Sequence, residues 1–333
     1  MKIVAFLPAK GSSSRVPEKN MKLFNGKPLF LHTLEKLCYC NFIDEVYLDS
    51  ESDEILSYAS YLPYKPFKRD PLLASNDATG DTLIYNEASS VQADIYVQIF
   101  CPFPFIRKET IKKGIDVLLQ NNDFDSVVLI KKDKLYLWQD GRPAYYVDGR
   151  IPNSFDLPDI IHETMGLYIT RHDVATQLKR RIGNKPYLLE AEPIEAVDIN
   201  TPSEFEMAEQ IANGIQSQEQ HYFNSIKHFF SSADFSDVLT EMKLNKVITG
   251  LMLNLPGKKI FGRANTMKIR ALREDENYKG IYETLKTYLK MQYGDIIVVE
   301  NEFDDRAYFG GINAHLALRA KGGDYSEWQN ARL

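Results

Sequence analysis

IVAFLPAKGSSSRVPEKNMKLFNGKPLFLHTLEKL, residues 3–37, joins an apolar run, a polar loop and an amphipathic segment in direct succession. The apolar run stops at Pro8, and the amphipathic segment starts at Pro28. The loop between them combines one glycine and three serines with four cations, Lys10, Arg15, Lys19 and Lys22. This succession predicts a buried strand, a cationic loop at its carboxyl end, and a helix.

Short β-branched or aromatic runs alternate with helical patterns along the first two thirds of the chain. Strands separated by helices indicate βαβ units, so we predict an α/β fold with a mostly parallel sheet. Ligands of such sheets bind at the carboxyl ends of the strands, where the opening loop is expected to lie. The predicted strands are 2–8, 45–50, 94–100, 125–131, 165–170 and 193–199, and the predicted helices are 28–41, 52–60, 80–91, 107–120, 171–180 and 202–213.

The apolar periodicity is lost in IANGIQSQEQHYFNS, residues 211–225, where Gln, Gly and Ser accumulate. We therefore predict a domain boundary near residue 218, with a first domain at 1–218 and a smaller α/β domain at 219–333. The second domain is expected to contain a helix at 231–244 capped by Ser231 or Ser232, strands near 265–271 and at 294–300, a helix at about 278–291, and a Gly-led helix at 310–323.

The composition is that of an ordinary globular protein, with 333 residues, 44% hydrophobic side chains and a net charge of -6. A general nucleic-acid binder would show a basic field, so we expect no nucleic-acid partner. Three cysteines are too few for a disulfide framework. The opening residues lack the layout of a signal peptide and no run is as apolar as a membrane span, so we expect a cytoplasmic protein with no membrane partner.

The loop after the first strand is suited to a polyphosphate. Backbone N–H groups in a Gly/Ser-rich turn can point at an anion, and Lys and Arg add positive charge. The spacing matches neither GxxxxGK[ST] nor GxGxxG. On composition alone, a phosphate site is favoured over a plain solvated loop.

The motif LPAKGSSSRVPEKNMKLFNGKPLF, residues 7–30, resembles the opening of the acylneuraminate cytidylyltransferase family. The resemblance continues through DEVYLDSESDEI, FKRDPLLASNDATGDTL and VDINTPSEFEMAE, and covers about residues 1–215. It implies a Rossmann-like nucleotidyltransferase that transfers CMP from CTP to a 2-keto sugar acid, releases pyrophosphate and uses Mg²⁺. It also implies a homodimer or a higher homo-oligomer.

Carried over residue by residue, the resemblance assigns roles to the loop. Arg15 and Lys19, together with Asp198, would be catalytic. The nucleotide would be bound by Ala9, Lys10, Gly11, Asn20 and Arg69. Thr79, in the same motif as Arg69, is expected instead to cap the following helix.

Asp198 and Asn200 are the predicted metal ligands. An acidic group after an apolar run, before a helix, is well placed to hold Mg²⁺ against a phosphate. The alternative is that one of the two caps the helix that starts near Pro202. The family pattern often reads D-I-D where this chain has DIN, so Asn200 would offer an oxygen without a charge.

The predicted acceptor side differs most from the family pattern. VQIFCPFPFIRKET keeps Gln98, which the resemblance implies to be a substrate-binding residue. Phe100 and Cys101 replace a threonine and a serine of the family pattern, so a sugar acid other than N-acetylneuraminate is possible. In IHETMGLYI, His162 and Glu163 could touch the sugar, and His162 could equally be an ordinary loop histidine. The alternative acceptors are a Kdo-type sugar or a sugar phosphate.

The tail at about 226–320 resembles part of the regulator of ribonuclease activity A family, whose relatives include class II pyruvate aldolases. The resemblance rests on SSADFSDVLTEM, FGRANTMKIR, YGDIIVVEN and RAYFGGINAHLALRAKG. An Arg-Asp pair expected after the Gly-led helix is missing, so the tail is interpreted as a regulatory, oligomerising or truncated module. A non-catalytic scaffold that works through this tail is therefore the rival function.

Overall fold

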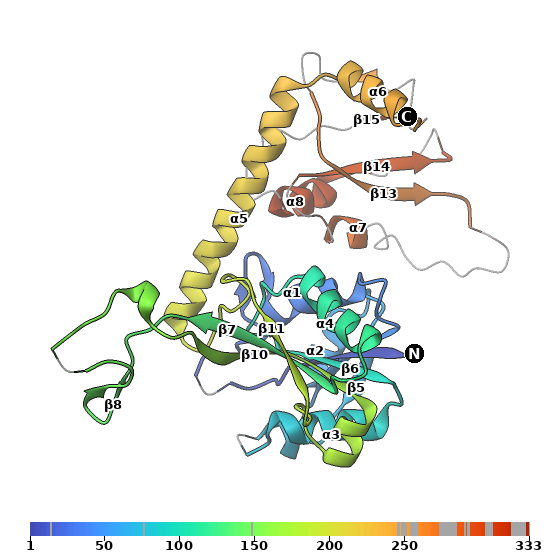
Figure 1. Cartoon of the computed structure of the whole chain (residues 1–333). Coiled ribbons are helices and arrows are strands. Elements are labelled where there is room, and N and C mark those ends of the chain that lie inside the picture. Colours follow the sequence, from blue (N-terminus) through green and yellow to red (C-terminus); the bar gives the residue numbers. More distant parts are fainter. Residues whose placement is uncertain are drawn as a thin grey trace. The chain divides into compact units, whose positions relative to one another are not determined.

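The computed structural model describes residues 1–13, 15–75, 77–147, 149–244, 247, 252–253, 259–272, 285–289, 291, 294–303, 309–320 and 331–332. The chain divides into two compact units, Met1–Glu209 and Gln210–Leu333. Helices and strands alternate in the first unit, as the sequence predicts (Figure 1).

A seven-stranded sheet forms the centre of the first unit, in the order β11-β7-β10-β6-β1-β4-β5. All neighbours pair in parallel except β10, which is antiparallel to both β6 and β7. The prediction of an α/β fold with a mostly parallel sheet is therefore confirmed. The strands are β1 (Ile3–Pro8), β4 (Glu45–Ser50), β5 (Lys65–Lys68), β6 (Ile95–Ile99), β7 (Ser126–Asp133), β10 (Ile160–Arg171) and β11 (Pro186–Glu190).

Helices cover both faces of this sheet. Apolar side chains of α1 (Leu29–Cys38), α2 (Asp53–Tyr58) and α4 (Lys108–Gln120) pack with the odd-numbered residues of β1. On the opposite face, α3 (Gly80–Ser90) packs against Val4 and Phe6. Because β1 is buried on both faces, it is a continuous apolar run rather than an alternating one.

Short elements complete the unit. The predicted Thr79 cap is confirmed, since its side chain accepts a hydrogen bond from Thr82 N at the start of α3. The segment between β7 and β10 extends away from the sheet (Figure 1). The remaining elements are β2 (Leu23–Phe24), β3 (Lys27–Pro28), β8 (Trp138–Gln139), β9 (Arg142–Pro143), 3₁₀ turns at Pro71–Ala74 and Ser154–Asp156, and a π-helical turn at Val174–Leu178.

The predicted strand at 193–199 is wrong, and the strand near it is β11. Residues 193–196 instead form a turn around Glu195, whose side chain is 1% exposed. Its carboxylate accepts hydrogen bonds from Arg107 N and Thr110 Oγ1 of α4 and from Glu192 N. Residues 193–196 therefore fold around the buried side chain of Glu195. The apolar residues on either side of Glu195 made the segment resemble a strand in the sequence. The edge strand β5, half of it exposed lysine, was also missed.

A 28-residue helix, α5 (Pro202–Phe229), begins in the first unit and continues through the polar segment at 211–225. The predicted boundary near 218 therefore falls within a helix, and the two compact units divide at 209/210. The loss of apolar periodicity in this segment did not end the helix.

The second unit contains α6 (Ser232–Glu241), and the predicted Ser231 cap is confirmed by a capping box with Asp234. The other elements are a parallel pair, β13 (Arg263–Ile269) and β14 (Asp295–Asn301), α7 (Leu285–Leu289), α8 (Gly311–Ala320), and a short pair, β12 (Met252–Leu253) with β15 (Ala331–Arg332). Parts of the motifs on which the tail resemblance rests, at 293, 306–308 and 321–322, lie outside the described residues. That resemblance stays a prediction.

Candidate active site

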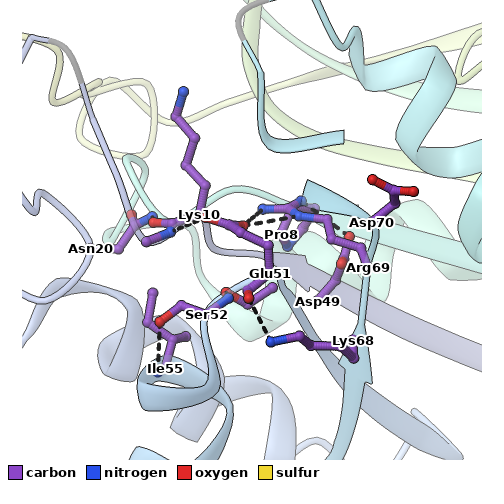
Figure 2. A network of polar contacts seen from close by, with 12 residues as sticks. Pro8, Lys10, Asn20, Asp49, Glu51, Ser52, Ile55, Lys68, Arg69 and Asp70 are labelled. Atoms are coloured by element: carbon purple, nitrogen blue, oxygen red, sulfur yellow. Dashed lines mark hydrogen bonds and ion pairs between the residues drawn. The ribbon is translucent and has the colours of Figure 1, made fainter. Parts of the chain in front are cut away.

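The loop after β1 is held in place by β4 and the residues that follow it. Ala9 N donates to Asp49 O at 2.8 Å, and Gly11 N donates to Glu51 Oε1 at 2.6 Å. Asn20 Nδ2 donates to Lys10 O at 2.8 Å, which ties the end of the loop to its start (Figure 2). The predicted loop residues therefore do come together at the carboxyl end of β1.

Lys19 is the most deeply placed cation of this loop. Its side chain is buried, and its Nζ donates to Ile199 O at 2.6 Å. Burial lowers the pKa of Lys19, nearby Asp198 opposes this shift, and the positive charges of Arg15 and Lys10 add to it. The four predicted residues therefore act on one another electrostatically, although Lys19 and Asp198 are far apart in the sequence. Arg15 itself is exposed.

Asp198 is partly buried, and burial is the main reason why its pKa is raised. Asn200 Nδ2 donates a hydrogen bond to Asp198 Oδ2, which works against that shift. The other carboxylate oxygen, Oδ1, is buried and has no hydrogen-bond partner among the described residues. The protein thus holds one carboxylate oxygen away from water without satisfying it.

The alternative that Asp198 or Asn200 caps α5 is wrong. Thr201 Oγ1 accepts from Glu204 N at 3.2 Å, and the Glu204 carboxylate accepts from Thr201 N and Asn200 N, both at 2.8 Å. Thr201 and Glu204 therefore satisfy the start of the helix with a reciprocal pair. Asp198 is left for another role.

A single carboxylate with an unsatisfied oxygen fits Mg²⁺ when phosphates supply further ligands. Among the described residues, no three side chains of His, Cys, Asp or Glu come together in a way that could hold a metal. Mg²⁺ in nucleotide sites is commonly held by one or two carboxylates together with substrate phosphates and water, so a larger protein cluster is not required. Asp198 meets that requirement, and Asn200 could add only a neutral oxygen.

Arg69 is buried and bound to carboxylates of its own unit. Its Nη1 lies 3.3 Å from Asp49 Oδ2, and its Nη2 lies 3.2 Å from Glu51 Oε2 (Figure 2). Because Glu51 also accepts from Gly11 N, Arg69 orients the loop through Glu51. The predicted contact between Arg69 and a nucleotide stays a prediction.

Gln98 is fully buried below the loop, where its Nε2 donates to Glu87 Oε2 at 2.9 Å. Asp49, Glu51 and Glu87 were not singled out from the sequence. A signal for the first two existed, because the acids of YLDSES directly follow an apolar run. Glu87 gave none, since it lies in the middle of an ordinary helical pattern.

His162 and Glu163 lie on β10, where they pair with Lys131 and Ile130 of β7. His162 Nε2 forms a hydrogen bond of 2.9 Å with Asp133 Oδ2, and Glu163 accepts from Tyr168 OH at 2.7 Å. Leu167, further along β10, is already opposite Ile99 at the carboxyl end of β6. Glu163 and His162 therefore project past that end of β6, and their contact with a sugar stays a prediction.

One cysteine and two lysines near the loop have structural surroundings. Cys101 is buried and donates to Pro8 O at 3.5 Å, below the loop. Lys22 stacks over the Phe205 ring, and Lys27 pairs with Glu35.

None of the helices in the described part of the chain is long and apolar enough to cross a membrane.

The sequence and fold of this chain were compared with protein families, with curated proteins and with solved structures, and each comparison finds similar proteins. A family model described as Cytidylyltransferase matches residues 4–229. Pseudaminic acid cytidylyltransferase of Campylobacter jejuni subsp. jejuni serotype O:2 is 32% identical over 127 residues, which is 36% of this chain and 55% of that protein. N-acylneuraminate cytidylyltransferase A of Danio rerio is 22% identical over 217 residues, 62% of this chain and 50% of that protein.

A third relative is CMP-N,N'-diacetyllegionaminic acid synthase of Legionella pneumophila, 28% identical over 123 residues, 35% of this chain and 53% of that protein. The chain therefore spans about half the length of the curated relatives it matches. A solved structure of CMP:2-keto-3-deoxy-manno-octonic acid synthetase complexed with CTP aligns with a TM-score of 0.49 and 17% identity, over 64% of this chain and 99% of that one.

Proposed function

Because this chain belongs to the cytidylyltransferase family, we propose that it transfers CMP from CTP to a nonulosonic acid and releases pyrophosphate. The observation that carries the proposal is the grouping of Lys10, Arg15 and Lys19 with the partly buried Asp198. The names of the relatives support the same reaction, since they act on pseudaminic, legionaminic and N-acylneuraminic acids.

The cations of the loop supply the charge that this reaction needs. When the sugar hydroxyl attacks the α-phosphate in line, negative charge moves to the departing pyrophosphate. Lys19, fixed by its bond to Ile199 O, would stabilise that charge without first rearranging, and the exposed Arg15 would add a second positive charge. A bound triphosphate would also favour the charged form of Lys19, which burial alone disfavours.

Asp198 would hold Mg²⁺, and Asn200 would assist with its amide oxygen, because its amide nitrogen donates to Asp198. When bound, Mg²⁺ neutralises phosphate charge and orients the triphosphate. The buried, unsatisfied Oδ1 of Asp198 supports this assignment. The ionised form of Asp198 is the ligand, so its raised pKa predicts that metal binding weakens at a higher pH than it would with an ordinary aspartate.

The acceptor is the least constrained part of the proposal. Phe100 lies partly buried at the carboxyl end of β6, with its ring 6.5 Å from that of Tyr168. The Arg181 guanidinium lies over both rings, 5.8 Å from the centroid of Phe100 and 4.2 Å from that of Tyr168. We favour a nonulosonic acid, with a Kdo-type sugar as the alternative, since a relative from Pelobacter propionicus named 3-deoxy-manno-octulosonate cytidylyltransferase is 25% identical over 206 residues.

A homodimer is part of the proposal. The segment between β7 and β10 exposes large apolar side chains, with Trp138 64%, Val147 79% and Phe155 71% exposed. Exposed apolar groups gathered on one segment are typical of an interface. A cytoplasmic location stays a prediction from the sequence.

The test is pyrophosphate release with CTP and Mg²⁺ against a panel of nonulosonic acids, Kdo-type sugars and sugar phosphates. Release with one class of acceptor, and with CTP but not with other nucleoside triphosphates, is the expected result. No CTP binding by calorimetry would contradict the proposal and favour a scaffold that works through the second unit.

A further inference from the structure

Two fully buried carboxyl groups, those of Asp49 and Glu87, interact beside Arg69. Asp49 is the fifth residue of β4, opposite Pro8 of β1, and Glu87 lies on α3. Both side chains are 0% exposed. Gln98 of β6 reaches the same place, since its amide donates to Glu87.

Burial raises the pKa of both carboxyl groups, and each group acts on the pKa of the other, so the two lie close together. Asp49 Oδ1 and Glu87 Oε1 are buried, and neither accepts from an N–H or O–H group of the described residues. A hydrogen bond between two carboxyl oxygens requires a proton, and a protonated acid beside a carboxylate satisfies both oxygens at once. Asp49 faces Arg69, so the negative charge belongs on Asp49 and the proton on Glu87.

Charge balance supports this distribution. Arg69 is the cation at this cluster, and it already pairs with Asp49 and with Glu51. The π-helical turn also packs against α3, but its neighbouring cations contact other groups: Lys179 stacks over Tyr85, and Arg181 pairs with Asp81. A third carboxylate, at the fully buried Glu87, would therefore lack a counter-charge, which is costly in a protein interior.

A continuous chain of contacts leads from Glu87 to the loop. Glu87 interacts electrostatically with Asp49, Asp49 pairs with Arg69, and Arg69 pairs with Glu51. Glu51 then accepts from Gly11 N at 2.6 Å. In the opposite direction, Glu87 fixes the amide of Gln98.

We propose that Glu87 is a positioning residue, which shares one proton with Asp49 and so fixes both the Gln98 amide and, through Arg69 and Glu51, the backbone of Gly11. The part of this inference that concerns CTP rests on the proposed function. The shared proton and the position of Gly11 do not.

Three variants separate positioning from stability. In Glu87→Gln, the amide oxygen can accept from Gln98 and the amide N–H can donate to Asp49, as the protonated acid does. Glu87→Leu removes both contacts. Ile84→Val is the matched control, because it trims a buried side chain on the same helix without touching the network.

The readouts are thermal unfolding, CTP affinity by calorimetry, and the amide resonance of Gly11 in full-length protein labelled with ¹⁵N-glycine. We expect Glu87→Gln to keep the Gly11 resonance and CTP affinity of the unsubstituted protein. Glu87→Leu should shift the resonance and weaken CTP binding about tenfold, a change of about 1.4 kcal/mol. Ile84→Val should lower the unfolding temperature and leave the CTP affinity and the Gly11 resonance unchanged.

Equal losses of affinity in Glu87→Gln and Glu87→Leu would overturn the shared proton, because the charged form would then be required. A weaker affinity in Ile84→Val, in proportion to its lost stability, would overturn the positioning role. If Glu87→Leu does not fold, infrared spectroscopy decides: the carbonyl stretch of a protonated carboxyl should be present in the unsubstituted protein and absent in Glu87→Gln. If the unsubstituted protein does not bind CTP, the proposed function fails, and the infrared and Gly11 signals still test the inference.

Discussion

Substitution of Glu195 by alanine should destabilise the first unit more than any loss of a surface charge could. The carboxylate accepts hydrogen bonds at 2.8 Å from Arg107 N, at 2.6 Å from Thr110 Oγ1 and at 3.1 Å from Glu192 N. Each bond to a charged acceptor contributes about 1.5–3 kcal/mol, and the three are not additive, since water can enter the space left by the side chain. We therefore expect a loss of about 3–4 kcal/mol from a typical total of about 5–15 kcal/mol.

The assay is equilibrium unfolding in urea. It measures the midpoint of the transition and the slope with which the free energy of unfolding falls with urea concentration. An unchanged slope with a lower midpoint would show that the native state lost stability without a change in the surface exposed on unfolding. Glu195→Gln should lose about half as much, because one amide oxygen can still accept from Arg107 N and Thr110 Oγ1, at about 1–2 kcal/mol.

Glu192→Ala is the matched control from the same turn. Its side chain is 66% exposed and lies 3.8 Å from Arg107 Nη2, so its removal should cost less than about 0.5 kcal/mol. If Glu195→Ala loses no more than Glu192→Ala, the turn is held by other contacts and the reasoning is refuted.

Three further predictions concern the proposed site and Lys36, a partly buried lysine of α1. Arg15→Ala and Asp198→Ala should each lower turnover by about a hundredfold or more while the unfolding temperature stays unchanged; near-normal pyrophosphate release in either would count against the assignment. Asn200→Asp should lower the Mg²⁺ concentration for half-maximal activity, because a second carboxylate adds charge, and titration of the rate with Mg²⁺ measures it. Burial lowers the pKa of Lys36 to about 8, so between about pH 8 and pH 10 the unfolded chain binds the extra proton and stability should rise with pH; urea unfolding of Lys36→Met should lack this rise.

The sheet could be predicted because its central strands are buried on both faces. Continuous apolar runs such as Ile3–Leu7 have one interpretation when helical patterns separate them, and the structure confirms it. Strand direction was harder. The run at 165–170 gave no sign that β10 is antiparallel, because direction depends on which neighbours it pairs with and not on its own residues.

The residues of the candidate site could be predicted only where they lie close together in the sequence or within a motif that resembles the family. Lys10, Arg15 and Lys19 lie in one loop, and the resemblance of that loop to a family points to Asp198. Glu87 could not be found in this way, because its partners come from two separate strands and from the segment after a third. A buried acid in a helix has the same local pattern as a surface acid, and only packing distinguishes them.

The antiparallel direction of β10 has a consequence for how the protein can be altered. Ile160 pairs with Asp133, so the segment 134–159 leaves the sheet and returns to it at neighbouring positions of β7 and β10. Since the entropy of closing a loop changes only slowly with its length, this segment can be lengthened, shortened or exchanged without shifting the register of any strand. Chimaeras that exchange residues 134–159 for those of a relative should therefore fold, which opens the segment to engineering independently of the nucleotide loop.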